Sequence, residues 1–285
     1  MPKGAAQSAA TRGAADGRAY KMTFQPVVPL AGIAGWQFLQ RTYDNQFEAF
    51  NQSVVLQRDT DYFRENIQNV LTAETLIADR RLLSVALGAF GLSEDINNKA
   101  FLQRILEDGT GSRDALANRL SDERYREFSD GFGFGPNQLI QTILPDFAEL
   151  IIHRYKTQQF EQAVGNQDET MRIALYAQRE LVEIAESTRS QDAQWFSVMG
   201  LPPLRTMMEK ALGLPASFGQ LDIDKQLVVF QEKAREKLGT DRLSELVEPE
   251  TLERLTNTYL ARSQIDSFNI STSGAAIALS LLSQS

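Results

Sequence analysis

The chain has 285 residues, 42% of them hydrophobic, with 37 acidic against 29 basic residues and no cysteine. The lack of cysteine excludes a disulfide scaffold, a cysteine-ligated zinc or iron–sulfur site and a thiol nucleophile. The net charge of −8 repels nucleic acid and anionic lipid, and no apolar run approaches the ~20 residues needed to span a bilayer, so we expect neither nucleic-acid binding nor membrane insertion.

The first 35 residues are expected to precede the helical body. Residues 1–21 are rich in alanine and glycine, and no apolar stretch follows their basic residues, which predicts a disordered N-terminal extension and no secretory signal. Met22 opens a more protein-like stretch and is an alternative start. Pro26 and Pro29 predict an extended lead-in segment over residues 22–35.

Residues 36–134 are expected to form a first helical unit, because their apolar residues recur at helical spacing. Helices are predicted over 36–52, 60–70, 73–90, 97–108, 114–120 and 122–128. Their expected N-caps are Thr60, Thr72, Ser112 and Ser121, and their expected stops are Gly91 and Gly109.

Residues 135–149 are expected to form a linker that leads into a long helix. The glycine-rich stretch from Gly131 to Pro136 predicts a loop, anchored by Phe132 and Phe134. An apolar stripe then runs from Leu139 to Tyr155 at helical spacing, and Pro145 should kink or split that helix.

Residues 150–264 are expected to form a second helical unit. Asp168 should begin one helix, Pro202 another and Pro249 a third, while Gly239 should end a helix over Ile223–Leu238. Alternation typical of strands is missing, so the sequence predicts an all-α multi-helix bundle of two tandem related helical units.

Residues 265–285 are expected to form a C-terminal tail. A loop-like stretch from Asp266 to Gly274 precedes an apolar one. We expect this tail to dock on the bundle or on a partner, and its candidate interaction residues are Ile277, Leu279, Leu281 and Leu282.

A weak internal repeat favours tandem copies over about 36–134 and 150–262. Three short matches recur in the same order: Arg41 with Gln46–Glu48 and Arg154 with Gln159–Glu161, Ala89–Leu92 and Ala211–Leu214, and Glu123 with Tyr125 and Glu250 with Leu252. The alternative is that any helical protein yields such short matches.

Few residues could support catalysis or metal binding. His153 is the only histidine, and its apolar helical surroundings predict a partly buried structural role. The glycines of 131–135 lack the Lys–Ser/Thr pair of a phosphate loop, and Asp222 is expected to cap a helix. Asp79, Arg80 and Arg81 are expected to face solvent or to form ion pairs between helices. We expect no metal site and no cofactor.

Several segments resemble the family known as domain of unknown function 1217, and the likeness covers about residues 24–264. They are Asp61–Val70, Ala78–Leu83, Ala89–Leu92, Ala117–Tyr125, Ala211–Pro215 and Leu221–Gln226. The resemblance implies a helical protein of alphaproteobacterial type whose gene often lies beside flagellar genes. It implies no active site.

The expected function is therefore a non-enzymatic one: a structural or protein-interaction role at the bacterial flagellum or in its assembly. The alternative is a helical adaptor or small-ligand-binding module unrelated to motility. An enzyme would require carboxylates, lysine or tyrosine gathered from different helices, which a sequence does not reveal. The expected location is cytoplasmic or outside the cell by a flagellar export route.

Overall fold

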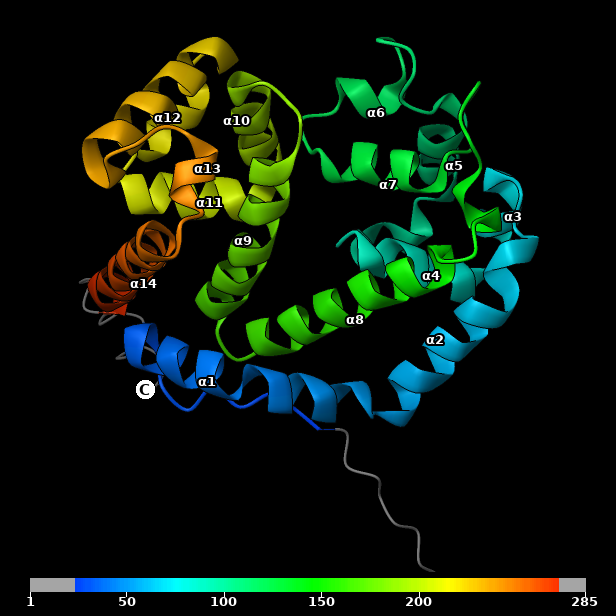
Figure 1. The fold of residues 1–285 in the computed structure, drawn as a ribbon, viewed down its shortest axis with the longest axis horizontal. Coiled ribbons are helices and arrows are strands. Elements are labelled where there is room, and N and C mark those ends of the chain that lie inside the picture. The colour runs from blue at the N-terminus through cyan, green and yellow to red at the C-terminus, as the bar shows by residue number, and fades with distance from the viewer. Residues whose placement is uncertain (1–23, 272–285) are drawn as a thin grey trace, which may run out of the picture.

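The computed structural model describes residues 24–271, and this part of the chain contains helices and no β-strand, which confirms the all-α prediction (Figure 1). The α-helices are α1 (Gly32–Asn51), α2 (Val54–Asn66), α3 (Ala73–Ala78), α4 (Arg80–Ala89), α5 (Lys99–Asp108), α6 (Leu116–Arg119), α7 (Arg124–Phe132), α8 (Phe147–Gly165), α9 (Glu169–Glu186), α10 (Gln191–Gly200), α11 (Pro202–Leu212), α12 (Ile223–Leu238), α13 (Leu243–Leu246) and α14 (Pro249–Ser271). Short 3₁₀ turns are η1 (Ile67–Asn69), η2 (Ser93–Asn97), η3 (Gln141–Ile143) and η4 (Ala216–Gln220). The expected extension over 1–21 and the four tail residues from Ile277 to Leu282 lie outside the described residues.

The buried apolar side chains gather in two cores. The first core combines α2 to α7 with the N-terminal half of α8, from Leu56 to Tyr155. The second core combines α9 to α14 with the C-terminal half of α8, from Phe160 to Leu260. Helix α8 therefore passes from one core into the other, and burial of its apolar residues stabilises both (Figure 1).

Helix α1 belongs to the second core, although the sequence analysis placed residues 36–134 in one unit. Trp36 and Leu39 are buried with the residues of α9 to α14. Further along α1, the rings of Tyr43 and Phe47 lie edge-on to Phe160 of α8, with centroids 5.2 and 5.5 Å apart. The spacing identified this apolar stripe, but an amphipathic stripe does not specify which core covers it.

Helix α1 also begins at Gly32, inside the predicted lead-in segment. Residues before it are extended, and the side chain of Gln46 holds them, because its Oε1 accepts from the Val27 N–H at 2.6 Å. A side chain at Gly35 would overlap the carbonyl of Leu30. Gly35, which lies within α1, therefore permits the lead-in segment to approach the helix closely.

Several predicted caps were confirmed and others were wrong. Thr72 caps α3 by accepting from the Thr75 N–H, whereas Thr60 is a buried residue inside α2, which Ser53 caps. The predicted helix over 73–90 is interrupted at Asp79, whose carboxylate accepts from the Arg81 and Leu82 N–H groups and so begins α4.

Around α6 and α7, neither predicted serine cap was confirmed. Ser112 accepts from the Asp114 N–H at 3.2 Å, but α6 begins only at Leu116, with Ala115 as its N-cap. Ser121 does not cap α7, because the carboxylate of Asp122 accepts from the Arg124 N–H. Helix α7 then extends through Phe132, beyond the point where the sequence predicted a loop.

The prediction of an inward-facing helical stripe over 139–144 was wrong. This segment is a loop around η3, and Leu139, Ile143 and Leu144 are exposed. Pro136 and Pro145 flank this segment and prevent a helix from continuing across it. Its apolar residues therefore lie in a loop, although they recur at helical spacing. The prediction that Pro145 splits the helix was right, because α8 begins only at Phe147.

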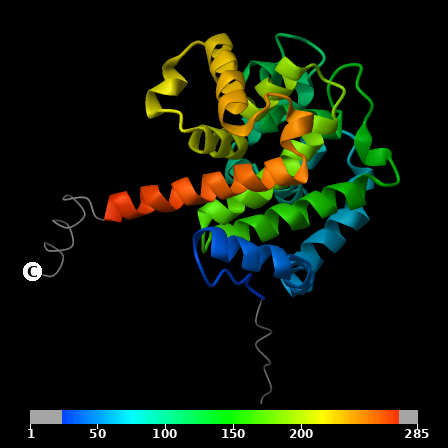
Figure 2. The same cartoon turned by 60° about the vertical axis from the view of Figure 1, so that its left-hand side comes forward.

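The boundaries in the second half follow the sequence more closely. Asp168 caps α9, Pro202 begins α11, and α12 spans Ile223–Leu238 as predicted. Helix α14 differs, because it continues through the predicted loop to Ser271. Figure 2 shows its last turns extending beyond the remainder of the helical body.

Candidate functional site

The two cores meet directly at a polar contact between α7 and α10. The N–H of Glu123 donates to the carbonyl of Gly200 at 2.9 Å. The carboxylate of Glu123 lies 3.2 Å from Arg126 of α7 and 3.0 Å from Arg189, which precedes α10. A Cβ at Gly200 would lie 3.2 Å from the Cβ of Glu123, so glycine permits this close approach.

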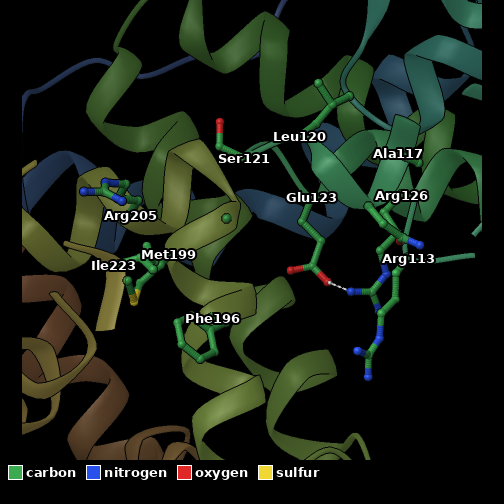
Figure 3. Close-up of a pocket in the computed structure, with 12 residues that line it drawn as sticks. Arg113, Ala117, Leu120, Ser121, Glu123, Arg126, Phe196, Met199, Arg205 and Ile223 are labelled. Carbon is green, nitrogen blue, oxygen red and sulfur yellow. Dashed lines mark ion pairs between the residues drawn. The ribbon is translucent and has the colours of Figure 1, made fainter. Parts of the chain in front are cut away.

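A pocket of about 730 Å³ lies beside this contact, between the two cores (Figure 3). Its volume is within the range of small-molecule sites, roughly 300–1,000 Å³. Residues of the first half and of the second half both line it: Arg113, Ala117, Asn118, Leu120, Ser121, Glu123 and Arg126 on one side, and Phe196, Met199, Gly200, Arg205 and Ile223 on the other.

The loop that presents Arg113 to this pocket is held by hydrogen bonds. The side-chain amide of Asn118 donates to the carbonyls of Thr110 and Ser112, each at 2.8 Å. The hydroxyl of Thr110 also accepts from Gln138 at 2.8 Å. These bonds fix the base of the Arg113 side chain, while the side chain itself is exposed.

The polar lining of the pocket is predominantly basic. Three arginines, Arg113, Arg126 and Arg205, face one carboxylate, Glu123. Arg205 is already engaged, because it pairs with Glu209 at 2.8 Å and donates to Gln226 at 2.6 Å. No ion pair within residues 24–271 includes Arg113.

A second group of ionisable residues gathers deeper in the junction, from three helices. Glu161 of α8 is 2% exposed and pairs with Arg179 of α9 at 3.3 Å, and Glu180 pairs with the same arginine at 2.8 Å. Burial, and then the carboxylates of Glu180 and Glu123, raise the pKa of Glu127 on α7 to about 8. Burial raises the pKa of Glu161 to about 7, although Arg179 opposes the rise.

This carboxylate group borders a smaller pocket of about 340 Å³, lined by Glu127, Arg154, Glu180, Glu183 and Arg189 among others. Carboxyl groups with raised pKa values are frequent at catalytic sites, and they also occur in structural ion networks. Arg179 binds two of the three carboxylates, as a structural network does. Chemically, the arrangement can retain protons near neutral pH at the junction of the two cores.

The residues singled out in the sequence are not brought together in one site. His153 is exposed on α8, so the prediction of a partly buried histidine was wrong. Asp222 caps α12 as predicted. Asp79 accepts from the Tyr62 hydroxyl at 2.7 Å and caps α4, in place of an ion pair between helices.

Sequence reasoning missed the buried carboxylates. Glu161 follows Phe160 in α8, and Glu180 precedes Leu181 in α9, so both glutamates adjoin fully buried apolar residues. That position was the available signal, because a charge beside an apolar stripe needs a partner. For Glu161 the partner, Arg179, is on the neighbouring helix α9, and spacing within one helix does not reveal it; for Glu180 the same arginine is the preceding residue.

In the described range 24–271, no group of three or more histidine, aspartate or glutamate side chains could hold a metal ion. None of the helices in that same range is long and apolar enough to cross a bilayer.

Comparison with known proteins gives a family and a fold. The sequence profile of the family described as "Protein of unknown function (DUF1217)" matches residues 89–252, more than half of the chain. A crystal structure of an Agrobacterium tumefaciens protein, determined as a structural genomics target, is similar with a TM-score of 0.68 and 23% identity, over 85% of this chain and 99% of that one. No curated protein matches the chain significantly.

Proposed function

Because the chain belongs to the DUF1217 family of proteins of unknown function, we propose that it has the role which its resemblance to that family implies, a non-enzymatic one at the bacterial flagellum or in its assembly. It would act there by binding other proteins. The acidic net charge of −8 argues against nucleic acid as the partner. The proposal allows a cytoplasmic location or export by a flagellar route, and mass spectrometry of shed filaments distinguishes the two.

The observation that supports protein binding is a group of exposed aliphatic side chains on two segments that pack together, Leu71 after η1 and Leu139, Ile143 and Leu144 around η3, which we call the aliphatic patch. These side chains are 51%, 61%, 52% and 38% exposed. Their backbone is held in place, because the hydroxyl of the fully buried Thr142 donates to the carbonyl of Val70 at 2.5 Å. Exposed apolar side chains gathered on one part of a surface are typical of sites of protein interaction.

Gene deletion tests the proposal. We expect the deletion strain to swim poorly or to assemble abnormal flagella, as seen by motility assay and electron microscopy. A deletion strain with normal motility and normal flagella would refute the flagellar role.

Complementation with variants then tests the patch. The double variant Leu139→Ser/Ile143→Ser should fold with unchanged stability and fail to restore motility, because it removes apolar contact area without touching either core. Leu221→Ser/Val228→Ser is the matched control, since both residues are exposed aliphatics of the other half, at 42% and 52%. Equal rescue by the two double variants would remove the patch from the proposal.

A second candidate function is a small-ligand-binding module, and the pocket between the two cores favours it. At about 730 Å³ it is large enough for a small organic molecule, and its lining combines apolar and charged residues. A ligand that binds only the folded state raises its melting temperature. A screen of small organic anions that produces no rise in melting temperature would count against this candidate.

The two halves are, we further propose, tandem copies of one helical unit. The support is the common order of their elements, in which α1 to α7 correspond to α8 to α14. Sequence profiles built separately from each half of related proteins provide the test, because true copies should match one another across the two profiles.

A further inference from the structure

We infer that the pocket between the two cores binds a small organic anion, whose negative group pairs with Arg113 and Arg126 and whose apolar body contacts Phe196 and Met199. This inference rests on the second candidate function. Three features support it: the ion pairing of the arginines in the lining, the apolar residues of the opposite wall, and the hydrogen bonds that hold the loop of Arg113.

The negative group is indicated by the arginines. Most arginines near the junction pair closely with carboxylates, as Arg189 does with Glu123 at 3.0 Å and Arg205 does with Glu209 at 2.8 Å. No ion pair of the described residues includes Arg113. Arg126 is paired with Glu123 at 3.2 Å, a carboxylate that it shares with Arg189, and more distantly with Asp130 at 3.9 Å, so Arg113 is the lining arginine whose charge is least compensated.

The location of these charges is unusual for this chain. The sequence has a net charge of −8, whereas the pocket lining has two more positive than negative residues. A basic site on an acidic protein attracts small anions locally, while the remaining surface repels large polyanions. The charge distribution therefore selects a small anion over nucleic acid.

The apolar body is indicated by the wall on the side of the second half. Phe196 is partly buried against the second core, Met199 is 4% exposed, and Ile223 is 48% exposed beside the pocket. Figure 3 draws Arg113 and Arg126 on one side of the pocket and Arg205 on the other, with Phe196 and Met199 from α10 between them. An aromatic or aliphatic group attached to a carboxylate, sulfonate or phosphate fits this pairing of surfaces.

The wall that presents Arg113 is held before any ligand binds. Asn118 holds the loop through Thr110 and Ser112, and the N–H of Leu116 donates to the carboxylate of Asp108 at 3.3 Å. Little ordering of the backbone would therefore accompany binding, which favours affinity.

The experiment uses the full chain and 8-anilinonaphthalene-1-sulfonate, a fluorescent aromatic sulfonate, with 2-naphthoate and the neutral 2-naphthalenemethanol as competitors. The informative variant is Arg113→Glu, and Arg119→Glu is its matched control, because Arg119 is also exposed, at the other end of α6, and does not line the pocket. A third variant, Ser121→Trp, places a large side chain at an exposed position of the lining without altering either core.

We expect one fluorescent site per chain. Arg113→Glu should weaken its affinity about tenfold or more, because a charge-assisted contact becomes a repulsive one. Arg119→Glu should stay within about twofold of the natural chain, Ser121→Trp should abolish the site, and naphthoate should displace the dye far better than the neutral alcohol.

Three results would overturn the inference. The first is an equal affinity of Arg113→Glu and Arg119→Glu for the dye. The second is equal displacement of the dye by the charged and the neutral competitor. The third is loss of dye binding only in Leu139→Ser/Ile143→Ser, which would place the dye on the aliphatic patch. These results leave the flagellar proposal untouched, and normal motility of a deletion strain would leave this inference untouched.

Discussion

Within the described residues, each half of the chain contains seven α-helices, α1 to α7 in the first and α8 to α14 in the second, and their lengths differ. Helices α4 and α11 both end at a glycine with positive φ, Gly91 at 69° and Gly213 at 71°. In both places the residue after the glycine satisfies a carbonyl of the last helical turn. The Leu92 N–H donates to the Leu87 carbonyl at 2.9 Å, and the Leu214 N–H donates to the Glu209 carbonyl at 2.8 Å. Helix termination is thus a feature that the halves have in common.

The elements after these glycines differ in length. Helix α5 has 10 residues and α12 has 16, while α7 has 9 and α14 has 23. The short α7 ends at Gly133 and leads into the exposed aliphatic patch, whereas the long α14 extends beyond the helical body (Figure 2). Length changes at the end of a unit alter its surface without displacing the core behind it.

The first helix of each half packs into the core of the other half, an exchange of helix contacts in which the C-terminal half of α8 stays in the second core. Helix α1 of the first half contributes Trp36 and Leu39 to the second core, and α8 of the second half contributes Phe147, Ile151 and Tyr155 to the first. The contact of α8 is close, since a Cβ at Gly88 would lie 2.6 Å from the Tyr155 ring. Neither half therefore completes its core alone.

The largest expected effect tests this exchange directly. We expect Trp36→Ala to cost about 3–5 kcal/mol, as does the loss of a large buried aromatic side chain elsewhere. Hydrogen exchange should show protection lost first in α9 and α14, which belong to the other half and contact α1. Phe63→Ala, equally buried in the first core, is the control and should weaken α2 and α4 instead. Early loss from α2 and α4 in Trp36→Ala would contradict the exchange.

The paired glycines give the next largest effect. Alanine at Gly91 or Gly213 should cost about 1–2 kcal/mol, because each backbone is left-handed. Gly213→Ala should cost somewhat more, because its Cβ would displace the Arg262 guanidinium, which donates to the Lys210 carbonyl at 3.3 Å, whereas the nearest atom to a Cβ at Gly91 is 3.4 Å away. Urea denaturation measures both, and Gly239→Ala, also at positive φ but with nothing within 4 Å of its Cβ, is the control for backbone strain alone. A larger cost at 91 than at 213 would contradict this ranking.

The junction between the halves should make stability depend on pH. The pKa of Glu127 is about 8 in the folded chain against an ordinary 4.5, so the folded state retains a proton that the unfolded state loses. That stabilisation is fully present below about pH 4.5 and is lost as the pH rises towards 8. Glu127→Gln should reduce the slope of stability against pH between 5 and 8 by at most about 1.4 kcal/mol per pH unit.

Thermal denaturation at several pH values measures this slope. Glu232→Gln, which alters an exposed glutamate on α12, is the control and should leave the slope unchanged. If Glu127→Gln and Glu232→Gln give parallel curves, Glu127 does not hold the proton.

The smallest expected effect concerns the aliphatic patch. Leu139→Ser should change the free energy of unfolding by less than about 0.5 kcal/mol, because the side chain is 61% exposed. Phe132→Ser, seven residues earlier but fully buried, should cost several-fold more. Calorimetry of the two variants shows whether the patch contributes to the stability of the fold. Comparable losses of stability in Leu139→Ser and Phe132→Ser would mean that Leu139 belongs to the core.

Local signals were readable in the sequence, and tertiary ones were not. The cap at Asp168 and the stop at Gly239 follow from backbone chemistry within a few residues, so the helix ends there were predicted. The break at Asp79 was not, because the apolar periodicity continues through it. The site was missed for a third reason: Arg179 and Glu161 are 18 residues apart and meet only when α8 and α9 pack.

The exchange of α1 and α8 also determines what a single cut in the backbone can do. The loop between α7 and α8 includes the exposed Asn137 and Leu139, so a protease can reach it. After cleavage there, each fragment still has a helix inserted among the helices of the other. The two fragments should remain interlocked and migrate together under native conditions, and they should separate only on denaturation.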